Sequence, residues 1–312
     1  MFAVFSAKAQ GRHYALAKVG MLIMKRKERL KLLIKRLPGS KRYIDFYRFC
    51  RDKIFCRRKN MTGQITALVE RVNGLQQQIR DYQDAAQYNR MKDDPQDRLA
   101  VYTVITGNYD TLKKPRYIDT NCDYFCITNN KALTSDFYRM IYIDDTERMG
   151  NARLSRYPKI NPHLFFPDYK HSLYVDANFT IMHSVWSWIF TYSRGRDMLM
   201  FFHPDRDCIY DEGIACIETN KDCPKVINQQ LERYRKEGYP SHHGLISGGI
   251  LYRKHNLPAM RAVDEMWWDE LQKGSKRDQL SFNYVCYRTG FQYDSCPLNY
   301  FKSPYFSYVG HI

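Results

Sequence analysis

The chain has 312 residues, enough for one large domain or two small ones, and a formal net charge of +16. Residues 1–60 hold 18 Lys or Arg against three acids, so this end carries +15 and the remainder only +1. The nine cysteines form no CxxC pair and no Cys/His zinc spacing, which argues against a disulfide framework or a zinc module and predicts reduced thiols in the cytosol. No apolar run approaches the roughly 18 residues of a membrane span, and the first twenty residues lack the order of a signal peptide.

The basic end, residues 1–60, is predicted to be a membrane-surface segment. "MLIMKRKERLKLLIKRL" (21–37) places apolar residues on one helical stripe among lysines and arginines, and Pro38-Gly39 ends the helix. A second basic stretch rich in aromatic residues follows at 41–60. Such segments bind anionic membrane surfaces. A solvated helix pair packed on its own domain is the alternative, and nucleic acid is not expected as a partner because no recognition module accompanies the charge.

Residues 61–92 are predicted to form a short coiled coil. Between 65 and 86 apolar side chains recur at alternating spacings of three and four, with β-branched residues at the first core position, a pattern that favours a parallel dimer. The alternative is a single amphipathic helix on the body of the protein. "MKDDPQDR" (91–98) reads as a linker to a domain at 93–312. The apolar positions are Ile65, Leu68, Val72, Leu75, Ile79, Tyr82 and Ala86.

From Leu99 onward the pattern is α/β. Buried strands are predicted in "RLAVYTVITG", "CDYFCITNN", "FYRMIYIDD", "YKHSLYVDAN", "DMLMFFHPDR" and "GLISGGILYRK", with helices near 150–165, 224–237, 257–273 and 277–289. This alternation predicts a mostly parallel, three-layer sheet. Ligands of such sheets bind beyond the carboxyl ends of the strands, where the polar clusters at 107–110, 128–130, 144–145 and 176–178 would gather.

Asp176 and Asn178 end one of these strands. Alone, this pair is more simply explained by a strand-terminating turn. Combined with the other strand ends it suggests a site for a divalent cation, Mn²⁺ or Mg²⁺, and a phosphate group. Arg153 and Lys159, six residues apart in the preceding segment, are predicted to reach a diphosphate.

Three further stretches carry polar side chains or glycines close to the predicted strands and helix starts. "FFHPDRDCIYDE" (201–212) supplies His203 and Arg206, which either hold a donor sugar or diphosphate or only complete a turn. "GLISGGILYRKHN" contains two glycines where backbone must approach another group closely. "RDQLSF" places Asp278 at a helix start, as a general base toward an acceptor hydroxyl or as a plain helix cap. His242-His243 is interpreted as part of a loop before a strand in preference to a metal site, and Trp267-Trp268 as helix core and rim, with sugar stacking as the alternative.

These stretches resemble a glycosyltransferase-like domain known from plant mucilage-related and pollen turgor-defect proteins and also present in bacteria. The motifs that carry the resemblance are "VYTVITGNYD", "ARLSRYPKINPHLFFPDY", "LYVDAN", "HPDRDCIYDE", "YPSHHGLISGGILYRKHN", "MWWDEL" and "RDQLSFNYV". The resemblance implies a GT-A-type, Rossmann-like fold and sugar transfer. It places Asp176 at the first acid of an Asp-x-Asp motif, in which Asn178 replaces the second acid. It also makes His311 a candidate third metal ligand, with a disordered terminus as the alternative.

The sequence therefore predicts a glycosyltransferase at the inner face of the cytoplasmic membrane, paired through its coiled coil into a homo-oligomer. It would move a hexose from a nucleoside diphosphate donor, most simply a UDP-sugar, to a hydroxyl of a growing, lipid-linked glycan of capsule or lipopolysaccharide type. Asp176, Arg206 and Asp278 are the candidate catalytic residues. The base and ribose pocket would be lined by Thr103, Thr106, Asn108 and Tyr109.

Two other classes of function stay open at this point. A degenerate domain could act as a scaffold or glycan-binding module, which Asn178 favours. A lipid hydrolase, a role proposed within the plant branch, would need an activated nucleophile or a closed metal site. The sequence contains no GxSxG and no HExxH motif.

Overall fold

The computed structural model describes residues 63–64, 66–72 and 97–310. The chain divides into two units, Met1–Gln77 and Gln78–Ile312, and every labelled element below belongs to the second. Of the predicted coiled coil only 63–64 and 66–72 are described, as helix. The basic segment at 1–60 and His311 lie outside the described residues, so the membrane segment and the dimer stay predictions. No helix in the described ranges has both the length and the apolar character to cross a bilayer.

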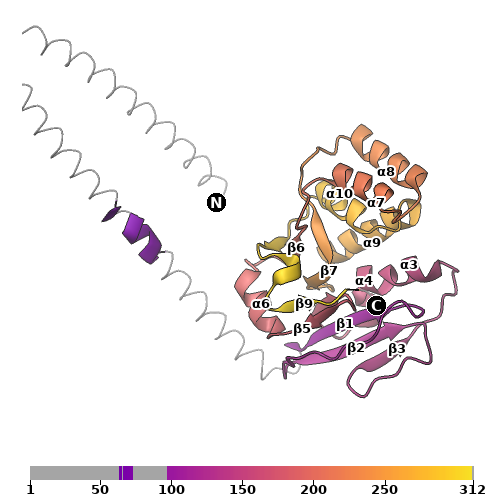
Figure 1. Ribbon diagram of the computed structural model, residues 1–312, viewed down its shortest axis with the longest axis horizontal. Helices are drawn as coiled ribbons and strands as arrows, with labels where there is room; N and C mark the ends of the chain where they lie inside the picture. The colour runs from indigo at the N-terminus through magenta and orange to yellow at the C-terminus, as the bar shows by residue number, and fades with distance from the viewer. Residues whose placement is uncertain (1–62, 65, 73–96, 311–312) are drawn as a thin grey trace, which may run out of the picture. The chain divides into compact units, whose positions relative to one another are not determined.

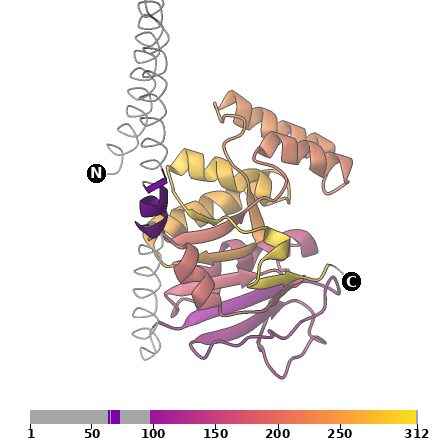
Figure 2. The same cartoon turned by 60° about the vertical axis from the view of Figure 1, so that its left-hand side comes forward.

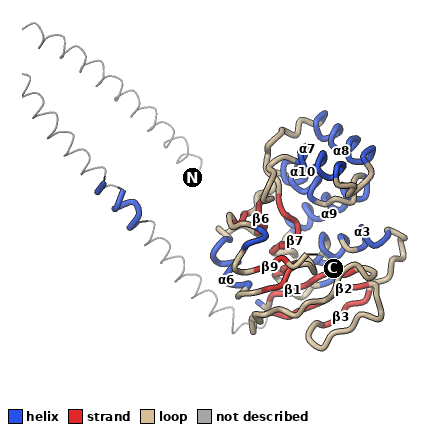
Figure 3. Tube along the Cα trace, in the orientation of Figure 1, coloured by secondary structure: helices blue, strands red, loops and turns tan. Residues whose placement is uncertain are grey.

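The second unit is built on a seven-stranded sheet (Figures 1 and 3). Within this sheet β7 runs antiparallel to both of its neighbours, and every other pair is parallel. This mixed α/β architecture with a mostly parallel sheet confirms the predicted fold class. The strands in spatial order are β3 (Arg139–Tyr142), β2 (Cys122–Thr128), β1 (Leu99–Ile105), β4 (His171–Val175), β7 (Ile246–Arg253), β6 (Met198–Phe202) and β8 (Asp294–Cys296).

The central strands are apolar throughout because both faces of the sheet are covered. Every residue of β1, "LAVYTVI", is buried, and its alternating side chains enter two different cores. Tyr102 and Val104 belong to the core on one face, while Leu99 and Val101 belong to the core on the other. The unit therefore has three layers.

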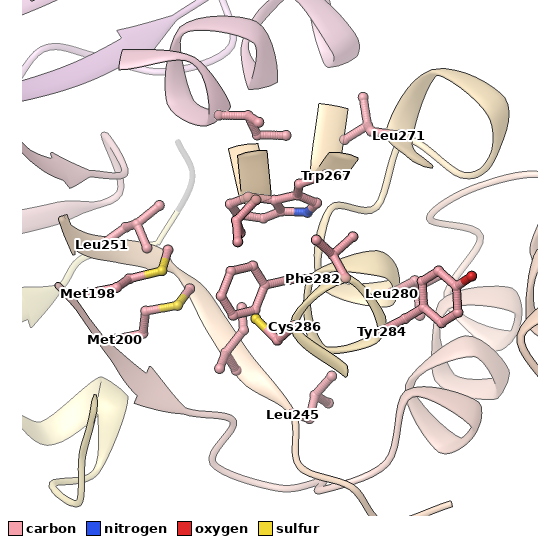
Figure 4. Close-up of a cluster of buried hydrophobic side chains, with 14 of the residues drawn as sticks. Met198, Met200, Leu245, Leu251, Trp267, Leu271, Leu280, Phe282, Tyr284 and Cys286 are labelled. Carbon is pink, nitrogen blue, oxygen red and sulfur yellow. The ribbon is translucent and has the colours of Figure 1, made fainter. Parts of the chain in front are cut away.

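One face is covered by the larger group of helices, which Figure 1 shows gathered beside β7. Figure 4 shows Met198 and Met200 of β6 and Leu251 of β7 in this core with Trp267 and Phe282, and all five are buried. The helices that contribute buried residues to it are α4 (Arg156–Ile160), α7 (Ile209–Glu218), α8 (Pro224–Lys236), α9 (Pro258–Lys273) and α10 (Gln279–Thr289), and the short α3 (Gly150–Leu154) and α5 (Pro162–Phe165) flank α4.

The opposite face carries α6 (Val185–Tyr192) and a small two-stranded sheet of β5 (Phe179–Ile181) and β9 (Phe306–Tyr308), seen from a second direction in Figure 2. A 3₁₀ turn, η2 (Tyr300–Lys302), precedes β9. The pairing of β5 with β9 brings the end of the described chain beside the segment that follows Asp176, and the Val309 amide donates to the Asn178 carbonyl at 2.9 Å.

The long apolar strands and the three long helices lie where the sequence predicts them. The helices and strands that the sequence did not predict are α6, α7, β5, β8 and β9. The three strands among them have three residues each, too few for a period-two pattern. α7 was interpreted only as a polar cluster, because its first turn carries Asp211 and Glu212.

A buried ion pair joins β7 to two helices. The Arg253 guanidinium donates to the Asp264 carboxylate of α9 at 2.5 Å and to the Ile160 carbonyl at 3.3 Å, and it also donates to the Lys159 carbonyl. Both charged side chains are fully buried. The pair therefore fixes the end of α4, the segment that carries Lys159 into the site described below.

Replacing Asp264 by Ala is expected to lower the free energy of unfolding by about 3–5 kcal/mol, because it leaves the Arg253 charge buried without a partner. Denaturant-induced unfolding measures the loss. Asp269→Ala on the same helix is the control: its carboxylate is 60% exposed and pairs with Lys273, so a change within about 1 kcal/mol is expected. Equal losses in both variants would contradict a special role for the buried pair.

Candidate functional site

The carboxyl ends of four parallel strands meet at one edge of the sheet. Asn129, after β2, accepts a hydrogen bond from the Gly107 amide at 2.7 Å and donates to Asn151 at 3.1 Å. Asn130 donates to Asn108, after β1, at 2.9 Å. Polar residues that are far apart in the chain thus form one hydrogen-bonded rim, as predicted for ligand-binding α/β sheets.

Two adjoining cavities open at this edge. The first, of about 720 Å³, is lined by the ends of β1 and β4 and by the start of the helical segment, including Asn108, Tyr109 and Asn151. The second, of about 400 Å³, extends toward β7 and α7. The residues that line both cavities are Arg156, Asp176, Asn178, Lys221 and Arg277. Three cations therefore meet at the border of the cavities.

Asp176 is placed at this border by the strand before it and by the neighbouring antiparallel strand. Its backbone amide donates to the Gly249 carbonyl at 2.7 Å, and its carboxylate accepts a hydrogen bond from the Tyr174 hydroxyl. Asn178 is buried at 7% exposure and lines the same two cavities. The predicted acid and amide are thus together, facing the cations.

A buried ion pair forms the floor of the second cavity. The Lys159 ammonium donates to the Asp278 carboxylate, and the Arg156 guanidinium lies 3.9 Å from the same oxygen. Burial alone would raise the pKa of Asp278, but the charges of Lys159, Arg156 and Arg277 hold it well below its usual range. The carboxylate is ionised and paired with Lys159, and its lowered pKa makes it a weak base. Its side chain also makes no cap hydrogen bond to α10.

Two consecutive glycines let β7 pass between the acids. A methyl group on Gly248 would lie 3.0 Å from the Lys159 nitrogen, and one on Gly249 would lie 1.9 Å from the Tyr300 hydroxyl and 3.1 Å from the Asp176 carboxylate. The sequence indicated a close backbone approach at this pair. The structure shows that the glycines make room for the charged and phenolic groups around the cavities.

His203, Arg206 and Glu212 form a hydrogen-bonded wall of the second cavity. The His203 Nδ1 accepts from the amides of Asp205 and Arg206 at 3.2 and 3.1 Å. Arg206 donates to the buried Glu212 carboxylate at 2.7 Å. Burial lowers the pKa of His203, so the ring is neutral near pH 7. The turn after β6 and the first turn of α7 supply these groups.

Two predicted site residues lie elsewhere. Arg153 does not line either cavity, because its guanidinium donates to the carbonyls of Leu271 at 3.4 Å and Gly274 at 2.9 Å. Arg156, three residues later, faces the site instead. Thr103 is on the other face of β1, beside a separate space of about 20 Å³. Thr106, by contrast, lines the first cavity and donates to the Asn151 carbonyl at 2.9 Å.

Several cavity residues were missed from the sequence. Arg277 stands inside the quoted "RDQLSF" motif, and two lysines bring further charge to the first cavity. Tyr300 reaches the second cavity from η2, and nothing in its local sequence indicates this. Basic side chains flanking a recognised motif are the signal that could have found the cations. The missed residues are Arg156, Lys221, Lys276, Arg277 and Tyr300.

Comparison with known protein families agrees with the resemblance seen in the sequence motifs. The family model of the TOD1/MUCI70 glycosyltransferase-like domain matches residues 127–309, more than half of the chain. The chain belongs to this family. The resemblance drawn from the sequence motifs is thereby confirmed, and the matched region holds Asp176, Asn178, the "HPDR" turn and Asp278.

A curated relative and a solved structure add to this. The relative is the "Probable hexosyltransferase MUCI70" of Arabidopsis thaliana, 22% identical over 214 residues, which are 60% of this chain and 37% of that protein. The chain thus matches little more than a third of the relative's length. The apo structure of mouse xyloside xylosyltransferase 1 superposes with a TM-score of 0.39 and 9% identity over 64% of this chain and 85% of that one, too distant to carry an argument about the site.

Asp278→Asn is expected to lower the free energy of unfolding by about 3 kcal/mol at pH 7, because Lys159 is left in the interior without its counter-charge. The folded-state pKa of Asp278 is lowered. Its stabilising effect is therefore complete above the unfolded pKa of about 4 and declines as the pH falls below that value. Denaturant unfolding between about pH 7 and pH 2 should show the gap between wild type and variant closing in acid.

Asp197→Asn is the matched control for this pH series. Asp197 pairs with Lys254 at 3.0 Å, but both side chains are about 40% exposed, so a change below about 1 kcal/mol is expected. A gap between wild type and Asp278→Asn that stays constant from neutral to acid pH would contradict an ionised Asp278.

Proposed function

We propose that this protein transfers a hexose from a nucleoside diphosphate donor, with UDP as the expected nucleotide, to a hydroxyl group of a glycan. The single observation that supports this most directly is the meeting of Arg156, Lys221 and Arg277 at the border of two adjoining cavities. Family membership supports glycosyl transfer as the reaction class.

The departing nucleoside diphosphate carries two to three negative charges that must be stabilised as the bond to the sugar breaks. The border cations are positioned for those charges, and Lys276 adds a fourth cation in the first cavity. The first cavity, with Asn108 and the exposed ring of Tyr109, is then the place for the nucleoside. The sugar lies in the second cavity, where the acceptor hydroxyl approaches it.

Asp176 and Asn178 suit a hard divalent cation. Mg²⁺ and Mn²⁺ bind oxygen ligands, and Mg²⁺ is commonly held by one or two carboxylates together with the phosphate oxygens of a substrate. The Asp176 carboxylate and the Asn178 carbonyl are the described side chains that would hold it. When bound, such an ion supplies further charge neutralisation to the diphosphate. The predicted third ligand, His311, lies outside the described residues.

Asp278 has a positioning role in this proposal, in place of the general base first expected. Its carboxylate holds the Lys159 ammonium at the cavity floor, and Arg156 lies beside both. His203 and Arg206, fixed by Glu212, form the wall nearest the sugar. These polar groups can orient sugar hydroxyls through hydrogen bonds.

The acceptor proposal extends to the amino-terminal part of the chain. A basic segment at 1–60 suits an anionic membrane surface, which is where a lipid-linked glycan of capsule or lipopolysaccharide type would be presented. The coiled coil predicted at 61–92 would pair the catalytic units there. Both ideas rest on the sequence pattern alone.

Arg277→Ala is expected to weaken UDP binding about 10- to 100-fold, because it removes a charge-assisted contact to the diphosphate. Titration calorimetry at low and high salt measures this, and the variant should show the smaller salt dependence. Lys236→Ala is the control, since that ammonium is 75% exposed on α8 and outside both cavities. Unchanged UDP affinity in Arg277→Ala would contradict the assignment of the border to the diphosphate.

Asp176→Asn is expected to lower the transfer rate at least about 100-fold while preserving the fold, because the amide keeps the shape and loses the charge. The transfer rate is measured with UDP-hexoses and Mn²⁺, and thermal unfolding verifies that the fold is preserved. Asp168→Asn, exposed before the opposite end of β4, is the matched control. Full activity in Asp176→Asn would contradict the assignment of the transfer site to this edge of the sheet.

A further inference from the structure

A second group of metal-ligating side chains lies outside both cavities. Cys208, Asp211 and His242 each offer one ligand atom, and these atoms all lie within 4.8 Å of one another. None of the three lines the cavities at the strand edge. Cys208 is buried, whereas Asp211 and His242 are exposed, so an ion could enter from solvent. The proposed transfer reaction does not use this group.

Two segments that are distant in the sequence build this cluster. Cys208 is the residue before α7, and Asp211 lies in its first turn, so the helix sets their spacing. His242 comes from the loop between α8 and β7, where its backbone adopts a φ of +52°, uncommon for a residue other than glycine. The Tyr210 hydroxyl donates to the Tyr239 carbonyl at 2.7 Å and holds the two segments together. The ligand atoms are therefore brought close by protein contacts.

The histidine is oriented by a neighbouring carboxylate. The His242 Nδ1 lies 2.7 Å from an oxygen of Asp207, the residue before Cys208. Histidines that bind metal ions usually donate their other ring N–H to a carboxylate or carbonyl, which fixes the ring and makes the coordinating nitrogen more basic. With the Nδ1–H donating to Asp207, Nε2 would carry the lone pair that an ion needs.

We propose that Cys208, Asp211 and His242 bind a zinc ion, with water at the fourth position. A thiolate and an imidazole select zinc over the hard cations Mg²⁺ and Ca²⁺, which prefer oxygen ligands only. The site is thereby distinct from the oxygen donors at Asp176. Bound zinc would link the start of α7 to the loop that leads into β7.

This link has a consequence for the cavity wall. α7 carries Glu212, which fixes Arg206, and β7 carries Gly248 and Gly249 between the two acids. A zinc ion at the proposed site would hold these two elements in register from outside the cavity. The inference does not depend on the identity of the donor or on sugar transfer itself.

The test uses the full chain, stripped of metal and titrated with Co²⁺ alone. Wild type is expected to show a thiolate-to-cobalt charge-transfer band in the near ultraviolet that saturates at one Co²⁺ per chain and that added Zn²⁺ abolishes. Cys208→Ser is expected to lose the band. Cys223→Ser, which removes an exposed thiol outside the cluster, is expected to keep it. A hard-cation site at Asp176 has no sulfur and gives no such band.

Two further variants separate metal binding from folding. His242→Ala is expected to weaken Co²⁺ binding at least about tenfold, and Asp207→Asn about 10- to 100-fold with the thiolate band still present at saturation. His243→Ala, at the adjacent position, is expected to change neither quantity. Circular dichroism verifies the fold of each variant.

A wild type without a thiolate band would overturn the proposal, and so would a band that persists in Cys208→Ser. If Cys208→Ser does not fold, the exposed His242 carries the test, and undiminished Co²⁺ affinity in His242→Ala overturns the site.

Discussion

The site depends on one buried charge, that of Lys159. Its ammonium is paired with Asp278 at the start of α10, and its carbonyl accepts a hydrogen bond from Arg253 of β7. One residue of α4 thus joins the sheet, the helical layer and the floor of the second cavity. A cation buried at 2% exposure is stabilised by its partner, so the cavity floor depends on the pair of Lys159 with Asp278.

The second constraint is the direction of the strands. Because β3, β2, β1 and β4 are parallel, their polar carboxyl ends meet at one edge, and the chain must leave that edge through loops. The loops between α7 and α8 and between α9 and α10 bring Lys221, Lys276 and Arg277 to the same edge. The cavities at this edge are therefore lined by strand ends that offer amide and carboxylate groups and by inter-helix loops that offer cations.

The sequence predicted the strand ends better than the cations. Asp176 and Asn178 come directly after an apolar strand in the sequence. The end of such a strand can be recognised from the residues next to it. Arg153 and Arg156 are equally basic and three residues apart, and only the packing of α3 and α4 against the end of α9 turns Arg153 to the Gly274 carbonyl and leaves Arg156 at the cavity. The proximity of Cys208, Asp211 and His242 was not predicted from the sequence, for a similar reason. The absence of a CxxC pair argued against a zinc module, whereas His242 joins Cys208 and Asp211 through a loop 31 residues beyond Asp211.

By itself the sequence determined the α/β class, the places of the long strands and helices, the acid and amide after β4, and the family. These features depend on periodicity and on short motifs, which involve only residues close together in the sequence. Tertiary structure alone decided which face each basic side chain took, that Asp278 is paired with Lys159, and that β5 pairs with β9 beside the site. Those outcomes require contacts between residues far apart in the chain, and the charge of a buried group depends on such contacts more than on the residues beside it.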